Sequence, residues 1–240
     1  DDYGEGAGFV PASNITGDKE TGLGNWTDGE IFRAITSGVD KEGKFLAPMM
    51  PYTLFNKMDK EDLYAIIAYI RTLPPIKNQI AEKNLKFPVN LIFRTIPADV
   101  TEYGKRPDGL DKIKQGEYLG YGCKFCHSPS EKGEILPGKE FAGGVEFPIP
   151  DGTIIRSSNI TPDKETGIGN MTRELFMAKF KSCIDASALD AKSRGFNTPM
   201  AWNFIAKTST DDDLSAIYDY LMSQKPVNNK VEKITLKGLK

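Results

Sequence analysis

A long internal repeat constrains this chain more than any other feature of its sequence. Residues 14–27 read NITGDKETGLGNWT and residues 159–172 read NITPDKETGIGNMT, so 11 of the 14 positions are identical. Weaker similarity continues downstream, where Met50-Pro-Tyr52 matches Met200-Ala-Trp202. Residues 63–70, in the last expected helix of the first copy, match residues 214–221 in the second. Solenoid repeats have periods of roughly 20–50 residues, which is much shorter than this spacing. The repeat therefore indicates two related domains.

Each copy predicts the same order of short helices. The repeated loop ends at Thr27 or Thr172, and a later segment starts at Asp59 or Thr210; all four are good N-cap residues. Apolar residues then recur with helical spacing, and no alternating strand of useful length is visible. We therefore expect an all-α fold class. The expected helices are residues 28–37, 59–73, 116–124, 173–185 and 210–224.

The repeat also sets the expected domain boundaries. We assign residues 1–75 to a first domain and residues 111–240 to a second domain. Residues 76–110 form a linker between them, with an apolar stretch that we expect to pack on one of the domains.

Composition excludes several classes of protein. Thirty-one basic and 33 acidic residues give a net charge of −2, which argues against a broad cationic face for nucleic acid. No apolar run reaches the ~18 residues of a membrane span, so we expect no transmembrane segment in this chain. Three cysteines are too few for a disulfide-stapled scaffold, and one histidine cannot form a bis-histidine metal site.

One short motif carries chemistry. Cys123, Cys126 and His127 fit C-x-x-C-H, the attachment pattern of c-type haem. Two cysteines three residues apart lie about one helical turn from each other, so their sulfurs can reach the two vinyl groups on one porphyrin edge. The adjacent histidine can then ligate the iron from one face. We therefore expect one haem c attached at Cys123 and Cys126.

A C-x-x-C-H sequence can also belong to a redox dithiol or a zinc site. A thioredoxin-type dithiol needs a strand–turn–helix context, which residues 116–122 do not suggest. A zinc site could combine Cys123, Cys126 and His127 with Cys183, but tetrahedral geometry makes it awkward for adjacent residues to bind one small ion. Haem attachment is the better interpretation.

The second axial ligand of the iron has to come from elsewhere in the sequence. Because the chain has no second histidine, methionine is the natural candidate. Met200 lies in a loop after Pro199 and has a counterpart in the first copy, so we predict it as the distal ligand. In the first copy the matching residue is Met50, from alignment of the aromatic residues, or Met49, from alignment of the prolines; we prefer Met50. The other methionines of the second copy are Met171, Met177 and Met222.

Together these features resemble class I c-type cytochromes. The motif at 123–127, the repeated loop, the Met200 loop and the closing helix carry the resemblance. The duplicated form is similar to dihaem cytochromes that serve as electron-transfer partners or subunits of bacterial periplasmic dehydrogenases. The resemblance implies covalent attachment at both cysteines, His127 as proximal ligand and Met200 as distal ligand. It also implies that the carbonyl of Pro137 orients His127.

The first copy departs from this pattern. His127 precedes the second repeated loop by 32 residues, and the same spacing before Asn14 falls ahead of residue 1. We therefore expect the first domain to be N-terminally incomplete and to lack its attachment motif in this chain. We expect a second haem there, ligated by Met50, with its motif lying upstream. The alternative is a degenerate domain without haem.

These features predict an electron-transfer protein and not an enzyme. With His and Met on both axial positions, iron would exchange single electrons without binding substrate. A peroxidase or thiosulfate-oxidising haem enzyme is the alternative, and Cys183 as an axial ligand is the feature that favours it. A cytochrome subunit of a larger dehydrogenase complex is a further alternative. We expect protein redox partners, no nucleic acid, and a periplasmic or other extracytoplasmic location, with membrane association through a complex or an upstream anchor.

Overall fold

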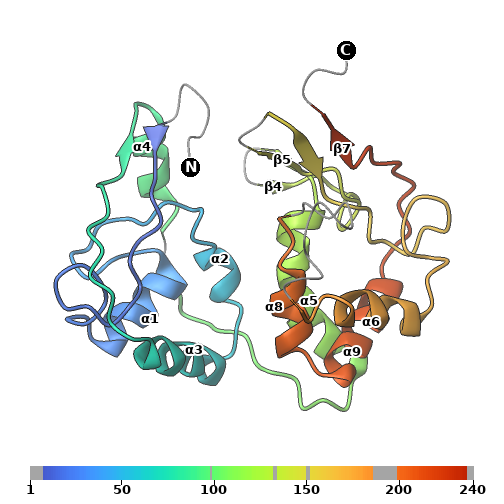
Figure 1. The fold of residues 1–240 in the computed structure, drawn as a ribbon, viewed down its shortest axis with the longest axis horizontal. Coiled ribbons are helices and arrows are strands. Elements are labelled where there is room, and N and C mark those ends of the chain that lie inside the picture. Colours follow the sequence, from blue (N-terminus) through green and yellow to red (C-terminus); the bar gives the residue numbers. More distant parts are fainter. Residues whose placement is uncertain (1–7, 98, 132–133, 150–151, 186–198, 237–240) are drawn as a thin grey trace. The chain divides into compact units, whose positions relative to one another are not determined.

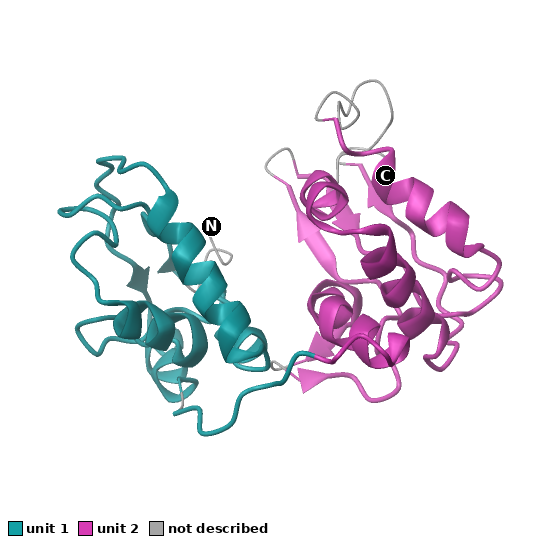
Figure 2. Ribbon diagram, turned by 90° about the horizontal axis from the view of Figure 1, so that it is seen from below, with its two compact units in different colours: residues 1–106 teal, residues 107–240 magenta. Residues whose placement is uncertain are grey.

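A computed structural model describes residues 8–97, 99–131, 134–149, 152–185 and 199–236 of the chain. The chain divides into two compact units, Asp1–Arg106 and Pro107–Lys240 (Figure 2). Each unit is described by itself below.

Between the repeated loop and residue 75 the first unit contains three helices, of which the first and third match the predicted ones and the second was not predicted. They are α1 (Asp28–Ser37), α2 (Tyr52–Phe55) and α3 (Lys60–Thr72) (Figure 1). Thr27 caps α1 in a capping box, because its side chain accepts from the Glu30 N–H while the Glu30 carboxylate accepts from the Thr27 N–H. Asp59 caps α3 by accepting from the N–H of Glu61. Both predicted helix starts are confirmed.

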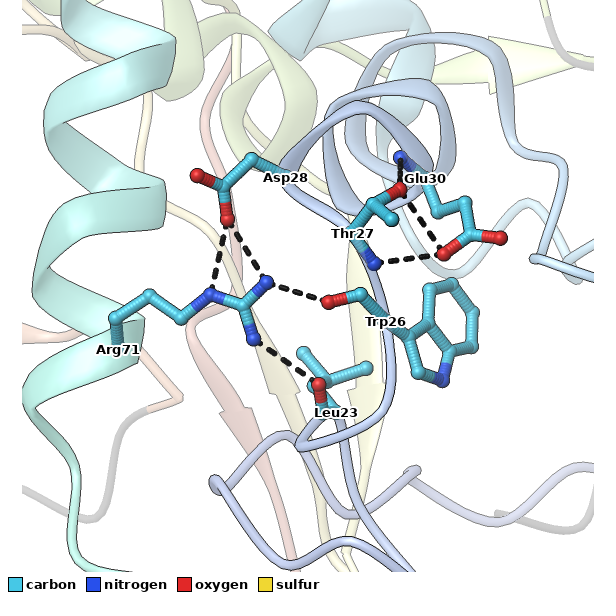
Figure 3. Close-up of polar contacts among 6 residues, drawn as sticks. All are labelled: Leu23, Trp26, Thr27, Asp28, Glu30 and Arg71. Atoms are coloured by element: carbon cyan, nitrogen blue, oxygen red, sulfur yellow. Dashed lines mark hydrogen bonds and ion pairs between the residues drawn. The ribbon is translucent and has the colours of Figure 1, made fainter.

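The core of the first unit lies between α1 and α3. It consists of the buried residues Ile31, Ile35, Leu63 and Ile67. Arg71, near the end of α3, reaches across to the loop that precedes α1 (Figure 3). Its guanidinium donates to the carbonyl oxygens of Leu23 and Trp26 at 3.1 and 2.6 Å and pairs with Asp28 at 2.8 Å. One side chain therefore joins α3 to the repeated loop and to the start of α1.

Most of the segment that we interpreted as a linker packs on the first unit. Strand β2 (Asn84–Leu85) pairs antiparallel with β1 (Gly8–Phe9), and α4 (Val89–Ile92) and a 3-10 turn (Phe93–Thr95) follow. The backbone N–H of Arg106 donates to Asp59 at the start of α3. These contacts place residues 76–106 in the first unit.

The second unit repeats this plan with an additional helix at its start. Helix α5 (Lys112–His127) comes first and is followed by α6 (Arg173–Lys181), α8 (Trp202–Thr208) and α9 (Asp211–Met222) (Figure 1). Thr172 and Thr210 cap α6 and α9 as predicted. Tyr218 of α9 donates from its hydroxyl to the Met171 carbonyl at 2.7 Å. Met171 is the counterpart of Trp26, so different side chains fasten the same loop position in the two units.

Helix α5 packs along α9 at very short range. A Cβ added at Gly116 would lie 1.9 Å from the carbonyl oxygen of Ala216, so only glycine permits this approach. At Gly120 a Cβ would lie 3.6 Å from the Tyr220 ring. The buried core beside this contact consists of Phe141, Ile168, Phe176, Phe180, Leu214, Ile217, Tyr220 and Leu221.

Short strands correct the expectation of an all-α fold. The second unit contains the pair β3 (Ser130–Glu131) and β4 (Glu134–Ile135), and a sheet of β5 (Glu146–Pro148), β6 (Ile154–Arg156) and β7 (Ile234–Thr235). All of them are two or three residues long, too short for an alternating pattern to show in the sequence. The structure is thus mainly helical with small strand pairs in the connections.

The repeated loop is held by the same hydrogen bonds in both units. Asn159 accepts from the N–H and hydroxyl of Thr161 at 3.0 and 2.8 Å, and its amide donates to the Val227 carbonyl at 2.8 Å. Asn14 does the same with Thr16 and the Ile76 carbonyl. The loop is therefore conserved between the copies because its asparagine anchors it to the segment after the last helix.

Candidate functional site

Helix α5 ends in the C-x-x-C-H motif. Asp111 caps the helix by accepting from the N–H groups of Ile113 and Lys114, so the helix begins about one turn before the position predicted at Gly116. His127 is its last residue, and the chain then turns away at Ser128, whose side chain accepts from the Phe141 N–H at 2.9 Å. The Asp111 cap and the hydrogen bond from the Phe141 N–H to Ser128 thus mark the two ends of the helix that carries the motif.

The His127 side chain is buried and held by one hydrogen bond. Only 8% of the residue is exposed, and its Nδ1 donates to the carbonyl oxygen of Ser158 at 2.7 Å. Since a carbonyl only accepts, this bond places the proton of the neutral ring on Nδ1 and leaves Nε2 with a lone pair. Burial lowers the pKa of His127, and the bond to Ser158 opposes this shift only in part. The imidazole is therefore in the form that ligates a metal.

Ser158, and not Pro137, supplies the orienting carbonyl. Pro137 lies on the exposed surface of the loop after α5. Ser158 directly precedes the anchored Asn159, and the N–H of Gly143 donates to the His127 carbonyl at 2.7 Å. Sequence reasoning missed Ser158 because a backbone oxygen gives no side-chain signal. Its position next to the repeated asparagine is the only clue that the sequence offers.

The two cysteines of the motif form no disulfide and lie in different surroundings. Burial raises the pKa of Cys123 to about 11, and it also raises the pKa of Cys126. A redox-active dithiol sits near a helix N-terminus, where the thiolate is stabilised and the pKa is lowered. Here the pair lies in the last turns of α5 and its pKa values move the other way, which argues against a thioredoxin-type function.

The structure does not support a zinc site. Within the described ranges, no group of three or more His, Cys, Asp or Glu side chains is placed to hold a metal ion. Cys183, the fourth ligand considered for zinc, is buried after α6 and its thiol donates to the Lys179 carbonyl at 3.4 Å. The Cys183 thiol therefore contacts the last turn of α6 and does not join the motif residues in a metal site.

Met200 and Cys123 pack on the same apolar cluster. Both are partly buried against the core of the second unit, and so are Met171, Met177 and Met222. Met200 lies just before α8, and its carbonyl accepts from the N–H of Trp202 at 2.9 Å. Residues 186–198, which precede it in the sequence, lie outside the described residues. Of these methionines, Met200 is the one that is matched by a methionine, Met50, in the first unit.

In the first unit, Met50 and Met49 differ in burial. Met50 packs against the core cluster between α1 and α3, whereas Met49 is 41% exposed. A ligand of a buried group has to face the core, so this difference favours Met50. Tyr52, two residues further, is buried just as its counterpart Trp202 is partly buried in the second unit.

The residues of the second unit fit a covalently bound haem. A buried imidazole presents Nε2, two thiols sit about one helical turn apart, and a thioether lies on the same apolar cluster as one thiol. A haem needs these donors and an apolar lining that excludes water. The donor set thus matches the group that the motif predicts.

Comparison with known proteins also finds c-type cytochromes. No protein-family model matches the chain. The chain is 30% identical over 237 residues to the cytochrome c subunit of the quinone-dependent alcohol dehydrogenase of Gluconacetobacter polyoxogenes. The aligned region covers 92% of this chain and 49% of that protein. It is 27% identical over 233 residues to the gluconate 2-dehydrogenase cytochrome c subunit of Pantoea cypripedii, covering 90% and 51%. It is 28% identical over 168 residues to a dihaem c-type cytochrome of Cereibacter sphaeroides, covering 65% and 54%.

The chain thus spans about half the length of the curated relatives that it matches. These similarities confirm the resemblance to dihaem c-type cytochromes and to the cytochrome subunits of bacterial dehydrogenases. They agree with an electron-transfer role in place of catalysis on a substrate.

Proposed function

We propose that this chain is an electron-transfer module with two haem c groups, which passes electrons from a dehydrogenase to a further protein acceptor. The observation that carries the proposal is the buried His127, whose Nδ1 donates to the Ser158 carbonyl at 2.7 Å at the end of the helix that bears Cys123 and Cys126. The similarity to dehydrogenase cytochrome subunits supports a dehydrogenase as the electron donor.

In the second domain, residues 111–240, Cys123 and Cys126 would hold the haem covalently, and His127 and Met200 would ligate its iron. The haem supplies reversible one-electron chemistry when it is bound. The protein contributes orientation, because Ser158 fixes the ring and the proton of His127. It also contributes an apolar wall, formed by the core cluster against which Cys123 and Met200 pack.

In the first domain, residues 1–75, Met50 would be the distal ligand of a second haem. The burial of Met50 against the core and the shared hydrogen bonds of the repeated loop support this assignment. The attachment motif of this haem would lie upstream of residue 1. The alternative is a degenerate first domain without haem. Counting the haems in the purified protein would distinguish the two cases.

The partners proposed for this module are protein redox partners, with a quinone- or flavin-dependent dehydrogenase as donor. No helix in the described part of the chain is long and apolar enough to span a membrane. We place the protein in the periplasm or another extracytoplasmic compartment, because thioether attachment of haem is completed there and because the relatives are subunits of bacterial dehydrogenases.

A redox titration of the purified natural protein tests this function. The proposal expects two one-electron steps, both with the spectrum of a haem with His and Met ligands, and no binding of carbon monoxide to the reduced protein. Binding of carbon monoxide or turnover of peroxide would instead indicate an open distal position and the haem-enzyme alternative.

A further inference from the structure

The first unit contains a cavity of about 310 Å³ beside helix α2. Its wall consists of the end of α1, helix α2 with the two residues that follow it, and residues 96 and 99–102. Eight of its ten lining residues carry a side chain that can form hydrogen bonds. None of these ten described residues belongs to the core cluster on which Met50 packs, so the cavity differs from the proposed haem site.

Two buried polar atoms on lining residues have no hydrogen-bond partner among the described residues. They are the hydroxyl oxygen of Tyr52, in α2, and Oδ1 of Asn56, directly after α2. Tyr52 is only 2% exposed, and burial raises the pKa of its hydroxyl, so this group keeps its proton and can donate. A buried polar group costs free energy unless a bound molecule or water becomes its partner.

Close packing on α1 holds Tyr52 in this wall. Gly38 caps the end of α1 with a φ of 72°, and a Cβ there would lie 2.5 Å from Cε1 of the Tyr52 ring. Thr36, also in the wall, already donates from its hydroxyl to the Phe32 carbonyl at 2.8 Å. The glycine therefore lets the tyrosine ring lie against the helix end, where solvent does not reach the hydroxyl.

The second unit builds the equivalent helix, α8, without this polar pair. At the offset that matches Met50 with Met200, Trp202 replaces Tyr52 and Ala206 replaces Asn56. Alanine has no polar side-chain atom, and the indole of tryptophan can donate but not accept. The fold that the two units share therefore does not require a hydroxyl and an amide oxygen at these positions.

The charges of the wall favour a neutral ligand. Lys57 contributes an ammonium, and Asp99 and Glu102 contribute carboxylates; all three residues are exposed. A charged ligand would therefore meet a like charge, whereas a hydroxyl group both donates and accepts. Ligand pockets have volumes of roughly 300–1,000 Å³. The volume of this cavity lies at the lower end of that range, which selects a small ligand.

We propose that this cavity binds a small neutral polyol, of the size of a single sugar ring, through Tyr52 and Asn56. Hydroxyl groups of the ligand accept from the Tyr52 hydroxyl and donate to Oδ1 of Asn56. Its remaining hydroxyls face Lys57 and the carboxylates of Asp99 and Glu102. The site goes beyond electron transfer and does not depend on it, because none of these residues is a proposed haem ligand.

Calorimetric titration of the purified natural protein tests the proposal. The neutral probes are D-glucose, D-fructose and myo-inositol at millimolar concentrations. Ethanolamine and glycolate serve as charged probes that also carry a hydroxyl. We expect at least one neutral probe to bind at a single site, and to bind more tightly than either charged probe. Tyr52→Phe and Asn56→Ala should each weaken that binding roughly tenfold, which is about the value of one hydrogen bond.

Tyr64→Phe is the matched control, because it removes the same hydroxyl outside the cavity, from α3, where Tyr64 is 49% exposed. This change should leave the affinity for the neutral probe unchanged. A second readout is the thermal midpoint of ligand-free protein. Tyr52→Phe should leave that midpoint unchanged or raise it, because the variant loses a buried hydroxyl that has no partner.

Failure of all three neutral probes to bind would overturn the proposal and would mean that the cavity holds water only. Tighter binding of a charged probe would overturn it too, and so would unchanged affinity in Tyr52→Phe or an equal loss in Tyr64→Phe. A lower thermal midpoint of ligand-free Tyr52→Phe would show that the hydroxyl already has a partner in the folded chain, which also contradicts the proposal.

Discussion

The Nδ1 of His127 donates a hydrogen bond of 2.7 Å to the carbonyl oxygen of Ser158, which joins the end of α5 to the start of the repeated loop. This one contact links the two sequence signals of the chain, the C-x-x-C-H motif and the repeat. The loop is anchored by Asn159, so its fixed backbone determines which ring nitrogen of the histidine faces the proposed iron.

The first prediction concerns the charge of His127 in haem-free protein. Because burial lowers its pKa below the ordinary 6.5, the folded ring stays neutral where the unfolded ring is already protonated. The unfolded state then binds more protons, and stability falls as pH drops below about 6.5. His127 is the single histidine, so one ring resonance in a proton NMR titration reports it. A midpoint at or above 6.5 would contradict the burial and bonding described here.

The second prediction concerns the reactivity of the motif thiols. With a pKa of about 11, roughly one Cys123 in a thousand is a thiolate at pH 8, and the thiolate is the reactive form. In haem-free Cys183→Ser protein, we expect Cys126 to be alkylated well before Cys123. Mass spectrometry after timed alkylation measures the order. Equal rates would mean that Cys123 is not buried in the core.

The third prediction concerns the contact between α5 and α9. Gly116→Ala forces a methyl group into the Ala216 carbonyl and should cost about 2–3 kcal/mol of stability. Gly122→Ala is the control in the same helix, because a Cβ there meets nothing within 4 Å. That change should be neutral or stabilising by up to about 1 kcal/mol. Urea unfolding monitored by circular dichroism measures both variants.

The fourth prediction concerns the distal ligands. Methionine raises the potential of a haem relative to other axial ligands, so its loss should lower the potential. Met200→Leu should lower the potential of one haem, and Met50→Leu that of the other. Met177→Leu and Met49→Leu are the controls, since Met177 packs in a helix and Met49 is largely exposed. A spectroelectrochemical titration measures the haem potentials of the four variants. If Met49→Leu and not Met50→Leu shifts a potential, the ligand in the first unit is Met49.

Sequence reasoning located helix starts well because capping has a chemical signature. Thr27, Thr172, Asp59 and Thr210 all cap their helices as predicted, since each places an oxygen where a free N–H needs an acceptor. The predicted start of α5 at Gly116 is too late, because the helix begins at Lys112. The structure shows that this glycine serves close packing inside the helix.

The parts of the site that escaped prediction depend on tertiary structure. The carbonyl of Ser158 is a backbone group, and only the folded loop brings it to His127. The exposure of Tyr69 on α3 also leaves no trace in its own sequence, because its buried counterpart Tyr220 on α9 is the same type of residue. It emerges only when the two units are compared.

The central claim is that a porphyrin is bonded through thioethers to the end of α5. Digestion of the natural protein after glutamate releases residues 118–131, which contain Cys123, Cys126 and His127. Mass spectrometry under denaturing conditions should find this peptide heavier by one haem, with neither thiol open to alkylation. A peptide of unmodified mass with two alkylatable thiols would contradict the account.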